Sequence, residues 1–130
     1  MEVSTPTILV VDDDDDLRAM LMEFLQGVGY ATADAPDGEI ALRLLEAEPA
    51  RFQLVLLDLL MPLVDGYVFR RMQRANPAIA DIPVITLSAS AIVRQRGLPD
   101  GIGPDNFMAK PADIEALLAL VAFHCGPPTP

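Results

Sequence analysis

Short apolar runs alternate with helical patterns five times along the chain, and this alternation limits the fold more than any other feature. Nearly every run precedes a segment whose apolar residues recur at helical spacing; in 37–47, Ile40, Leu44 and Leu45 are expected to face inward. The alternation predicts an α/β fold, a single doubly wound parallel sheet of five strands with helices on both faces. The expected strands are 7–11, 30–33, 53–57, 82–87 and 106–109.

The helix expected between the last two strands is interrupted in the sequence. Residues 97–104 include three glycines and two prolines, which cannot sustain a regular helix. The fourth helix is therefore predicted to be short or irregular. We expect at most a short turn near 90–96, followed by an irregular loop.

Composition narrows the class of protein. A chain of 130 residues, 52% of them apolar, predicts one domain over 1–125, with a Pro-rich tail or the start of a linker at 126–130. The formal charge of −10 argues against direct nucleic-acid binding and against an anionic membrane surface. Residues 1–4 lack the pattern of a signal peptide, and the single Cys125 fits a reducing cytoplasm.

Polar side chains follow four of the five expected strands. Asp12 and Asp13 come after the first strand, Asp58 after the third, Ser88 after the fourth and Lys110 after the fifth. Because the carboxyl ends of parallel strands lie along one edge of the sheet, these groups are expected to meet there. Each alone has an ordinary explanation as a helix cap, a turn residue or a surface charge. That explanation is much weaker for the whole set.

Phosphoryl transfer to a carboxylate suits this set of groups. Carboxylate oxygens favour Mg²⁺, or Mn²⁺ in its place. Asp58 is the expected nucleophile and would form an aspartyl phosphate. Lys110 would neutralise charge on the transferred group, and Ser88 would donate a hydrogen bond to one of its oxygens.

Five consecutive aspartates, Asp12 to Asp16, divide between chemistry and helix initiation. Only Asp12 and Asp13 are assigned to cation binding. Asp15 and Asp16 fall in the first turn of the next helix, where a carboxylate stabilises the unpaired backbone amides. Asp14 lies at the entry to that helix and is expected only to add negative charge.

Four blocks of sequence resemble the receiver domain of bacterial two-component response regulators, the family that includes the chemotaxis receiver. The similarity runs from Ile8 to about Val121, and it implies the flavodoxin-like strand order 2-1-3-4-5. The blocks are Ile8–Asp13, Val55–Pro62 with Asp65-Gly66, Pro83–Ala89 and Phe107–Pro111.

The resemblance implies a phosphoacceptor and a metal site. Asp58 would accept a phosphoryl group from a phosphohistidine of a partner histidine kinase or histidine phosphotransfer protein. Asp13, Asp58 and the backbone carbonyl of Leu60 would bind Mg²⁺ directly, and Asp12 would act through water. Leu60 has no polar group to position an attacking water, so we expect modest autodephosphorylation.

The resemblance also implies a switch. Ser88 matches the hydroxyl that moves toward the phosphoryl group, and Phe107 matches the aromatic ring that then turns inward. Lys110 matches the family's lysine, and the Lys110–Pro111 bond its cis peptide. Phosphorylation would bias the surface around the fourth and fifth strands, and with the last helix that face could also form a homodimer. Such a domain is not an enzyme beyond its own phosphorylation and dephosphorylation.

Three alternatives remain at this point. Asp12-x-Asp14 after an apolar strand resembles the motif of haloacid-dehalogenase-type phosphatases, which leaves the Asp58 block unexplained and needs a longer domain. An interaction module that is never phosphorylated stays open because of the irregular fourth helix. A flavin-binding module is disfavoured, because five aspartates would repel the flavin phosphate. The partner kinase, the pathway and the output do not follow from the sequence.

Overall fold

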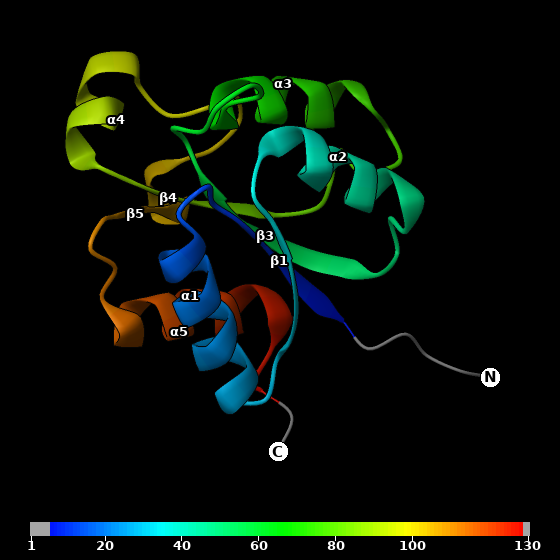
Figure 1. Cartoon of the computed structure of the whole chain (residues 1–130), viewed down its shortest axis with the longest axis vertical. Coiled ribbons are helices and arrows are strands. Elements are labelled where there is room, and N and C mark those ends of the chain that lie inside the picture. Colours follow the sequence, from blue (N-terminus) through cyan, green and yellow to red (C-terminus); the bar gives the residue numbers. More distant parts are fainter. Residues whose placement is uncertain (1–5, 129–130) are drawn as a thin grey trace.

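The structure is a computed structural model that describes residues 6–128, in which five strands form one sheet (Figure 1). All neighbouring strands are parallel, in the order β2-β1-β3-β4-β5. The predicted doubly wound α/β fold and its strand order are confirmed. The strands are β1 Thr7–Val11, β2 Ala31–Ala35, β3 Phe52–Asp58, β4 Val84–Ser88 and β5 Phe107–Ala109.

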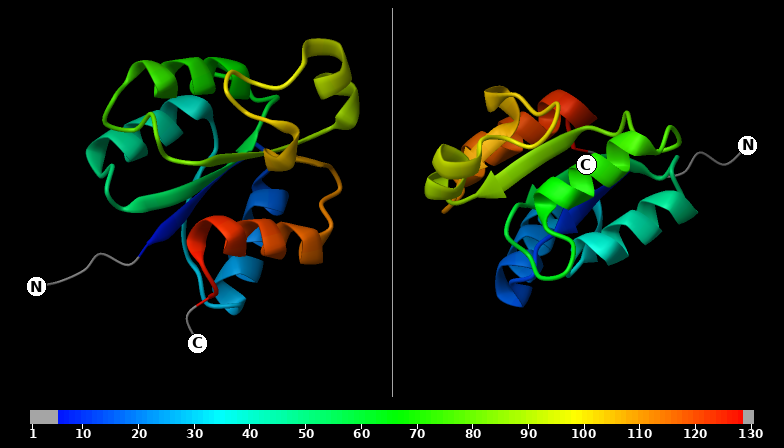
Figure 2. Two further views of the ribbon diagram at one scale, coloured as in Figure 1. Left: turned by 180° about the vertical axis from the view of Figure 1, so that it is seen from behind. Right: turned by 90° about the horizontal axis from the view of Figure 1, so that it is seen from above.

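Helices cover both faces of this sheet. Helices α1 and α5 lie on one face and α2 and α3 on the other, as Figures 1 and 2 show from three directions. Helix α4 projects beside α3, and a short 3₁₀ turn, Pro104–Asn106, precedes β5. The helices are α1 Asp15–Gly27, α2 Gly38–Ala47, α3 Gly66–Ala75, α4 Ser90–Arg96 and α5 Ile114–Cys125.

The central strands are buried on both faces. In β1, Ile8 and Val10 join the core cluster under α1 and α5, whereas Leu9 and Val11 join the cluster under α2 and α3. Residues 54–57 of β3 are each at most 1% exposed. This burial explains why the sequence of these strands is continuously apolar instead of alternating.

Four of the helices begin after an aspartate that caps them. The side chains of Asp14, Asp37, Asp65 and Asp113 each accept a hydrogen bond from a backbone N–H in the first turn of the helix that follows. Such a cap stabilises a helix by about 1 kcal/mol. Asp113 caps α5, and Asp14, expected only to add charge, is the cap of α1.

Helix α4 has seven residues and ends at Arg96; Gly97, which follows it, has a φ of 77°. An irregular loop follows, so the predicted short fourth helix and loop are confirmed. Side chains of α3 hold this loop: the Tyr67 hydroxyl donates to the Gly97 carbonyl, and the Arg70 Nε donates to the Asp100 carbonyl, both at 2.8 Å. The loop is thus fixed to α3.

Two sequence expectations need correction. Ile40 was expected to face inward but is 39% exposed, because Ala41, Leu42 and Leu45 form the buried side of α2. Leu44 is half-buried beside them. The second and fourth strands begin and end later than the apolar runs at 30–33 and 82–87. Parallel pairing with β1 carries β2 on to Ala35, and parallel pairing with β5 carries β4 on to Ser88.

The two ends of the described chain lie close together. Pro6 and Pro127 line the same small cavity of about 60 Å³, together with Cys125. The Tyr30 hydroxyl donates to the Gly126 carbonyl at 2.8 Å and holds the segment after α5. Residues 1–4 and the end of the predicted tail, 129–130, lie outside the described residues. Within 6–128, no helix is both long and apolar enough to span a membrane.

Candidate functional site

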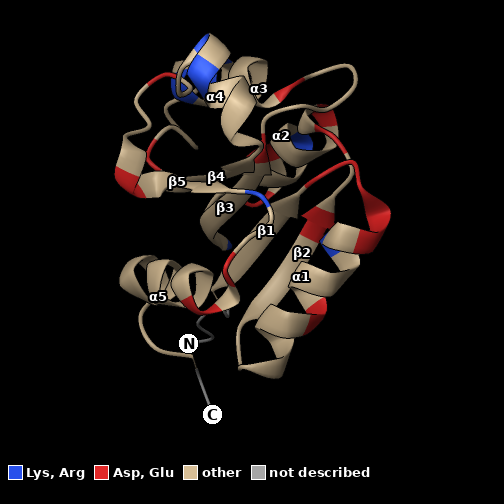
Figure 3. Cartoon of the chain, turned by 90° about the vertical axis from the view of Figure 1, so that its left-hand side faces the viewer, with Lys and Arg blue, Asp and Glu red and all other residues tan. Residues whose placement is uncertain are grey.

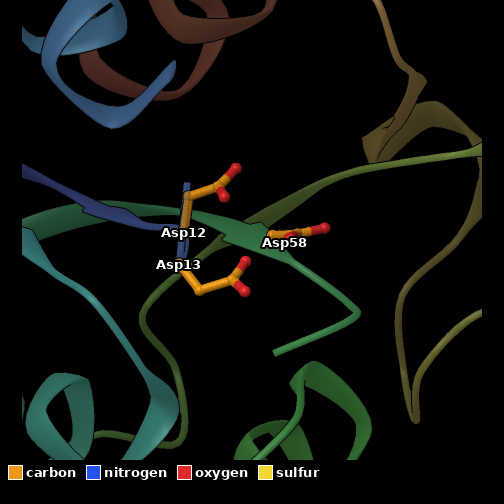
Figure 4. A group of neighbouring side chains, drawn as sticks. All are labelled: Asp12, Asp13 and Asp58. Atoms are coloured by element: carbon orange, nitrogen blue, oxygen red, sulfur yellow. The ribbon is translucent and has the colours of Figure 1, made fainter. Parts of the chain in front are cut away.

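Three carboxylates meet at the carboxyl edge of the sheet (Figure 4). Asp12 and Asp13 directly follow β1, and Asp58 is the last residue of β3. One oxygen from each of the three carboxylates lies within 4.8 Å of the other two. Asp12 and Asp58 are only 3% and 6% exposed, whereas Asp13 is exposed. The predicted convergence of these residues is confirmed.

Lys110 adds a positive charge to the cluster. Its Nζ lies 3.0 Å from Oδ2 of Asp12 and 3.5 Å from Oδ1 of Asp58. Burial by itself would lower the pKa of Lys110, but the hydrogen bond to Asp12 and the charge of Asp58 outweigh burial and raise it. Lys110 is therefore an ammonium group, and it is held between the two buried carboxylates.

Burial and a neighbouring charge perturb Asp58. Removal from water, followed by repulsion from Asp12, raises the pKa of Asp58 to about 6. The charge of Lys110 and a hydrogen bond from the Leu60 backbone N–H act in the opposite direction without cancelling the rise. A carboxylate whose ionisation is disfavoured in this way gains stability when a cation or cationic group comes close.

The carboxylates of Asp12 and Asp13 differ in the hydrogen bonds and ion pairs that they already make. Oδ1 of Asp12 accepts a hydrogen bond from the Asp14 N–H at 2.9 Å, and Oδ2 accepts one from Lys110. Among residues 6–128, no hydrogen bond or ion pair engages the Asp13 carboxylate. Asp13 is therefore the carboxylate of the pair that is free to take a new ligand.

Arg18 balances the acidic run and was missed from the sequence. Its guanidinium donates to the Asp12 carbonyl at 2.7 Å, to Asp34 at 2.8 Å and to Asp15 at 2.7 Å. Its side chain is only 13% exposed, so it acts as a buried anchor between α1, β1 and β2. The sequence did offer one indication of this role, because Arg18 is the first basic residue after the five consecutive aspartates.

The loop after Asp58 folds back closely over the end of β3. The Gly66 N–H donates to the Leu59 carbonyl at 2.9 Å. A Cβ at Gly66 would lie only 2.7 Å from the Asp58 carbonyl oxygen, so a larger residue does not fit without displacement. The glycine of the Asp65-Gly66 pair thus permits the close approach of α3 to the site. Leu60, on this loop, is 46% exposed.

Ser88 and Phe107 occupy the neighbouring strands. Ser88 is 2% exposed, ends β4 opposite Ala109, and accepts at its carbonyl a hydrogen bond from the Lys110 N–H at 2.9 Å. Phe107 begins β5 opposite Thr86 and is half-buried. Ser88 therefore lies beside Lys110, while Phe107 lies further back along the same strand pair. The expected cis peptide at Lys110–Pro111 is present.

The donor set fits a hard divalent cation. Three carboxylate oxygens gather at a partly open edge, two from buried side chains and one from an exposed side chain. Mg²⁺ is bound in proteins through one or two carboxylates, with other sites left to water or phosphate oxygens. The raised pKa of Asp58 reflects its removal from water and then repulsion from Asp12, and a bound cation would offset both.

A doubly wound sheet with three carboxylates, a lysine and a buried serine at its carboxyl edge defines a class of domain. Such a domain can hold a cation and an anionic group against one carboxylate. Comparison with known sequences gives the family: the chain belongs to the response regulator receiver domains, whose family model matches residues 8–122.

Two curated relatives are transcriptional regulators. The chain is 38% identical over 119 residues to the transcriptional regulatory protein PrrA of Mycobacterium tuberculosis, covering 92% of this chain and 49% of that protein. It is 33% identical over 117 residues to the DNA-binding dual master transcriptional regulator RpaA of Synechocystis, covering 89% and 47%. The chain thus spans about half the length of these relatives.

Solved structures agree with the fold. The receiver domain of a sensor histidine kinase from Pseudomonas aeruginosa, with a magnesium ion coordinated in its active site cleft, superposes with a TM-score of 0.81. It is 28% identical, over 95% of this chain and 99% of that one. The chemotaxis protein CheY4 of Vibrio cholerae gives a TM-score of 0.75 at 29% identity, over 93% and 99%.

Proposed function

We propose that Asp58 accepts a phosphoryl group from a phosphohistidine of a sensor histidine kinase or a histidine phosphotransfer protein, in the cytoplasm and with Mg²⁺. The main support is the position of Asp58, beside the Lys110 ammonium and within 4.8 Å of two further carboxylates. The family match and the magnesium ion in a similar receiver domain agree with this proposal.

In the proposed reaction a carboxylate oxygen of Asp58 attacks phosphorus. The bond between phosphorus and the donor imidazole breaks, and the ring nitrogen keeps its electron pair. With a pKa of about 6, Asp58 is mostly ionised at neutral pH and can act as the nucleophile. Lys110, already 3.5 Å from Asp58, offsets negative charge on the transferred group.

The metal would be held by Asp13, Asp58 and the backbone carbonyl of Leu60, with Asp12 acting through water. The existing partners of both Asp12 oxygens and the unengaged state of Asp13 favour this division of roles. When bound, Mg²⁺ would supply positive charge to the phosphoryl oxygens. Asp12 would keep Lys110 oriented through its hydrogen bond of 3.0 Å.

The proposal extends to a switch around β4 and β5. The Ser88 hydroxyl would move to a phosphoryl oxygen, and Phe107, half-buried at the start of β5, would then turn inward. A homodimer through β4, β5 and α5 belongs to the same proposal. It is supported by Phe123, which is 83% exposed on α5. We also keep the division into a receiver over 1–125 and a tail or linker start at 126–130, since α5 ends at Cys125.

The phosphoryl donor would dock on an apolar groove beside the site. This groove, which we call the α1–α5 groove, has a volume of about 550 Å³ and lies between α1 and the segment that leads into α5. Lys110 lines it too, so it is continuous with the carboxylate cluster. Its other lining residues are Leu17, Met20, Leu21, Leu87, Pro111, Ala112 and Ile114.

The test uses phosphoramidate, a small donor with the same phosphorus–nitrogen bond. With Mg²⁺, the wild-type protein should gain one phosphoryl group by intact mass, and Asp58→Asn should gain none. Asp14→Asn is the matched control and should still be labelled, because the Asp14 side chain is occupied in capping α1. Labelling that persists in Asp58→Asn but is lost in Asp12→Asn would favour the phosphatase-type mechanism instead.

A further inference from the structure

Positive charge is concentrated on two neighbouring helices of this acidic protein. Residues 66–97 contain five arginines and only one carboxylate, Asp81, whereas the whole chain has a formal charge of −10. Figure 3 shows the basic positions gathered on α4 and α3, with acidic positions spread over α1, β2 and α2. We call the four exposed arginines of this region, Arg71, Arg74, Arg94 and Arg96, the arginine ridge.

Contacts between α3 and α4 hold the ridge in one arrangement. The Arg96 guanidinium lies over the Tyr67 ring, 3.9 Å from its centre. Tyr67, Arg71 and Arg74 share one side of α3, because residues four and seven apart lie on the same helical face. The Arg70 and Tyr67 hydrogen bonds to the loop after α4 fix the two helices relative to each other. The ridge therefore exists before any partner binds.

The ridge arginines keep unused hydrogen-bonding capacity. Arg74 approaches Asp100 and Arg96 approaches Asp65 only at 3.9 and 3.8 Å, beyond hydrogen-bond distance, and both arginine side chains are 45% exposed. Over residues 6–128, no ion pair or hydrogen bond engages the side chain of Arg71 or Arg94. These guanidinium groups remain available to a ligand from outside.

We propose that the arginine ridge binds an acidic segment of a partner protein, through carboxylates of two or more Asp or Glu residues. A guanidinium presents parallel N–H donors that match the two oxygens of a carboxylate. The ridge is short and is bounded by Asp65 and Asp100. The remaining surface is strongly acidic, so it would repel an extended polyanion such as nucleic acid, whereas a short acidic peptide can lie on the ridge alone.

The position of the ridge connects it to the rest of the domain. Helix α4 begins at Ser90, two residues after Ser88, the last residue of β4. A partner held by Arg94 and Arg96 would thus contact the helix that directly follows the proposed switch residue. Binding at the ridge does not require phosphorylation, so this inference stands or fails separately from the role of Asp58.

The probe is a fluorescent peptide of about eight residues with alternating Glu and Ala, titrated by anisotropy at about 50 mM salt, where ionic contacts are weakly screened. The double variant Arg71→Glu/Arg94→Glu should weaken binding at least about tenfold, as expected for the loss of two charge-assisted contacts. Both residues lack internal partners, so the variant should unfold at the same urea concentration as the wild type.

The matched control is Arg43→Glu/Arg51→Glu, which makes the same change of charge outside the ridge. The affinity of this control for the peptide should fall by less than about threefold, because only the overall charge of the protein changes. Asp58→Asn should bind as the wild type does. Three results would overturn the inference: equal losses in both double variants, tighter binding of a single-stranded oligonucleotide of equal charge, or dimerisation of the protein alone that the ridge variant abolishes.

Discussion

Asp58→Asn should stabilise the metal-free protein, and the gain should grow as the pH rises. The pKa of Asp58 is raised from 3.8 to about 6 in the folded state. The folded protein therefore binds this proton more tightly than the unfolded chain does. Stability from this group is fully present below pH 3.8 and is lost as the pH rises through about 6. Asparagine, which cannot ionise, avoids that loss.

The size of the effect follows from the pKa difference. At about 1.4 kcal/mol per pKa unit, a shift of about two units means that ionisation of Asp58 lowers the free energy of unfolding by roughly 3 kcal/mol at neutral pH. At about pH 4.5, Asp58 is already largely ionised in the unfolded chain but still protonated in the folded protein. The stability lost through this group is then only roughly 1 kcal/mol. The stability advantage of Asp58→Asn should thus grow by about 2 kcal/mol between about pH 4.5 and pH 7.5.

Urea unfolding in the presence of a chelator measures this difference at both pH values. Asp13→Asn is the matched control, because it removes an exposed carboxylate of the same cluster and should give less than half of the pH-dependent gain. Added Mg²⁺ should stabilise the wild type more than the variant and narrow the difference. A gain that is independent of pH, or a variant less stable than the wild type at about pH 7.5, would refute the reasoning.

Further substitutions test other parts of the structure by urea unfolding. Arg18→Gln should lose roughly 2 kcal/mol, because the Asp12 carbonyl and Asp34 lose a charged donor; an unchanged midpoint would contradict its role as an anchor. Gly66→Ala should lose about 1–3 kcal/mol, since its Cβ would meet the Asp58 carbonyl, and a loss below about 0.5 kcal/mol would show that the loop adapts. Leu60→Asn, which gives this exposed position a polar group to hold an attacking water, should shorten the lifetime of the phosphorylated protein. A wild-type lifetime of only seconds would count against the expected slow hydrolysis.

The fold could be predicted from the sequence because local pattern and tertiary environment agree. The buried strands are continuously apolar, and each is followed by helical spacing, so the doubly wound sheet follows. The glycines and prolines at 97–104 also predicted that α4 would be short and would be followed by an irregular loop. The position of Ile40 could not be predicted in this way, because the buried side of α2 depends on how Ala41 and Leu45 meet the sheet.

The carboxylate cluster was predictable because parallel strands present their last residues at a common edge. Asp12, Asp13 and Asp58 meet there without any long-range information beyond strand order. The full role of Arg18 was not predictable, because Asp12 and Asp15 are its neighbours in sequence but Asp34 comes from β2 and meets Arg18 only in the folded sheet. The cap at Asp14 was missed because one aspartate among five carries no distinguishing pattern.

The shared cavity lined by Pro6 and Pro127 has a practical consequence. A short glycine-rich bridge could join the two ends of the described chain, and new ends could be opened at Gly103, which is exposed and has nothing within 4 Å of its missing Cβ. Such a circular permutant would keep Asp12 and Asp58 in their strands while cutting the loop between α4 and β5. A reporter inserted at the cut would then show whether the loop that follows α4 stays attached to α3 in the permuted protein.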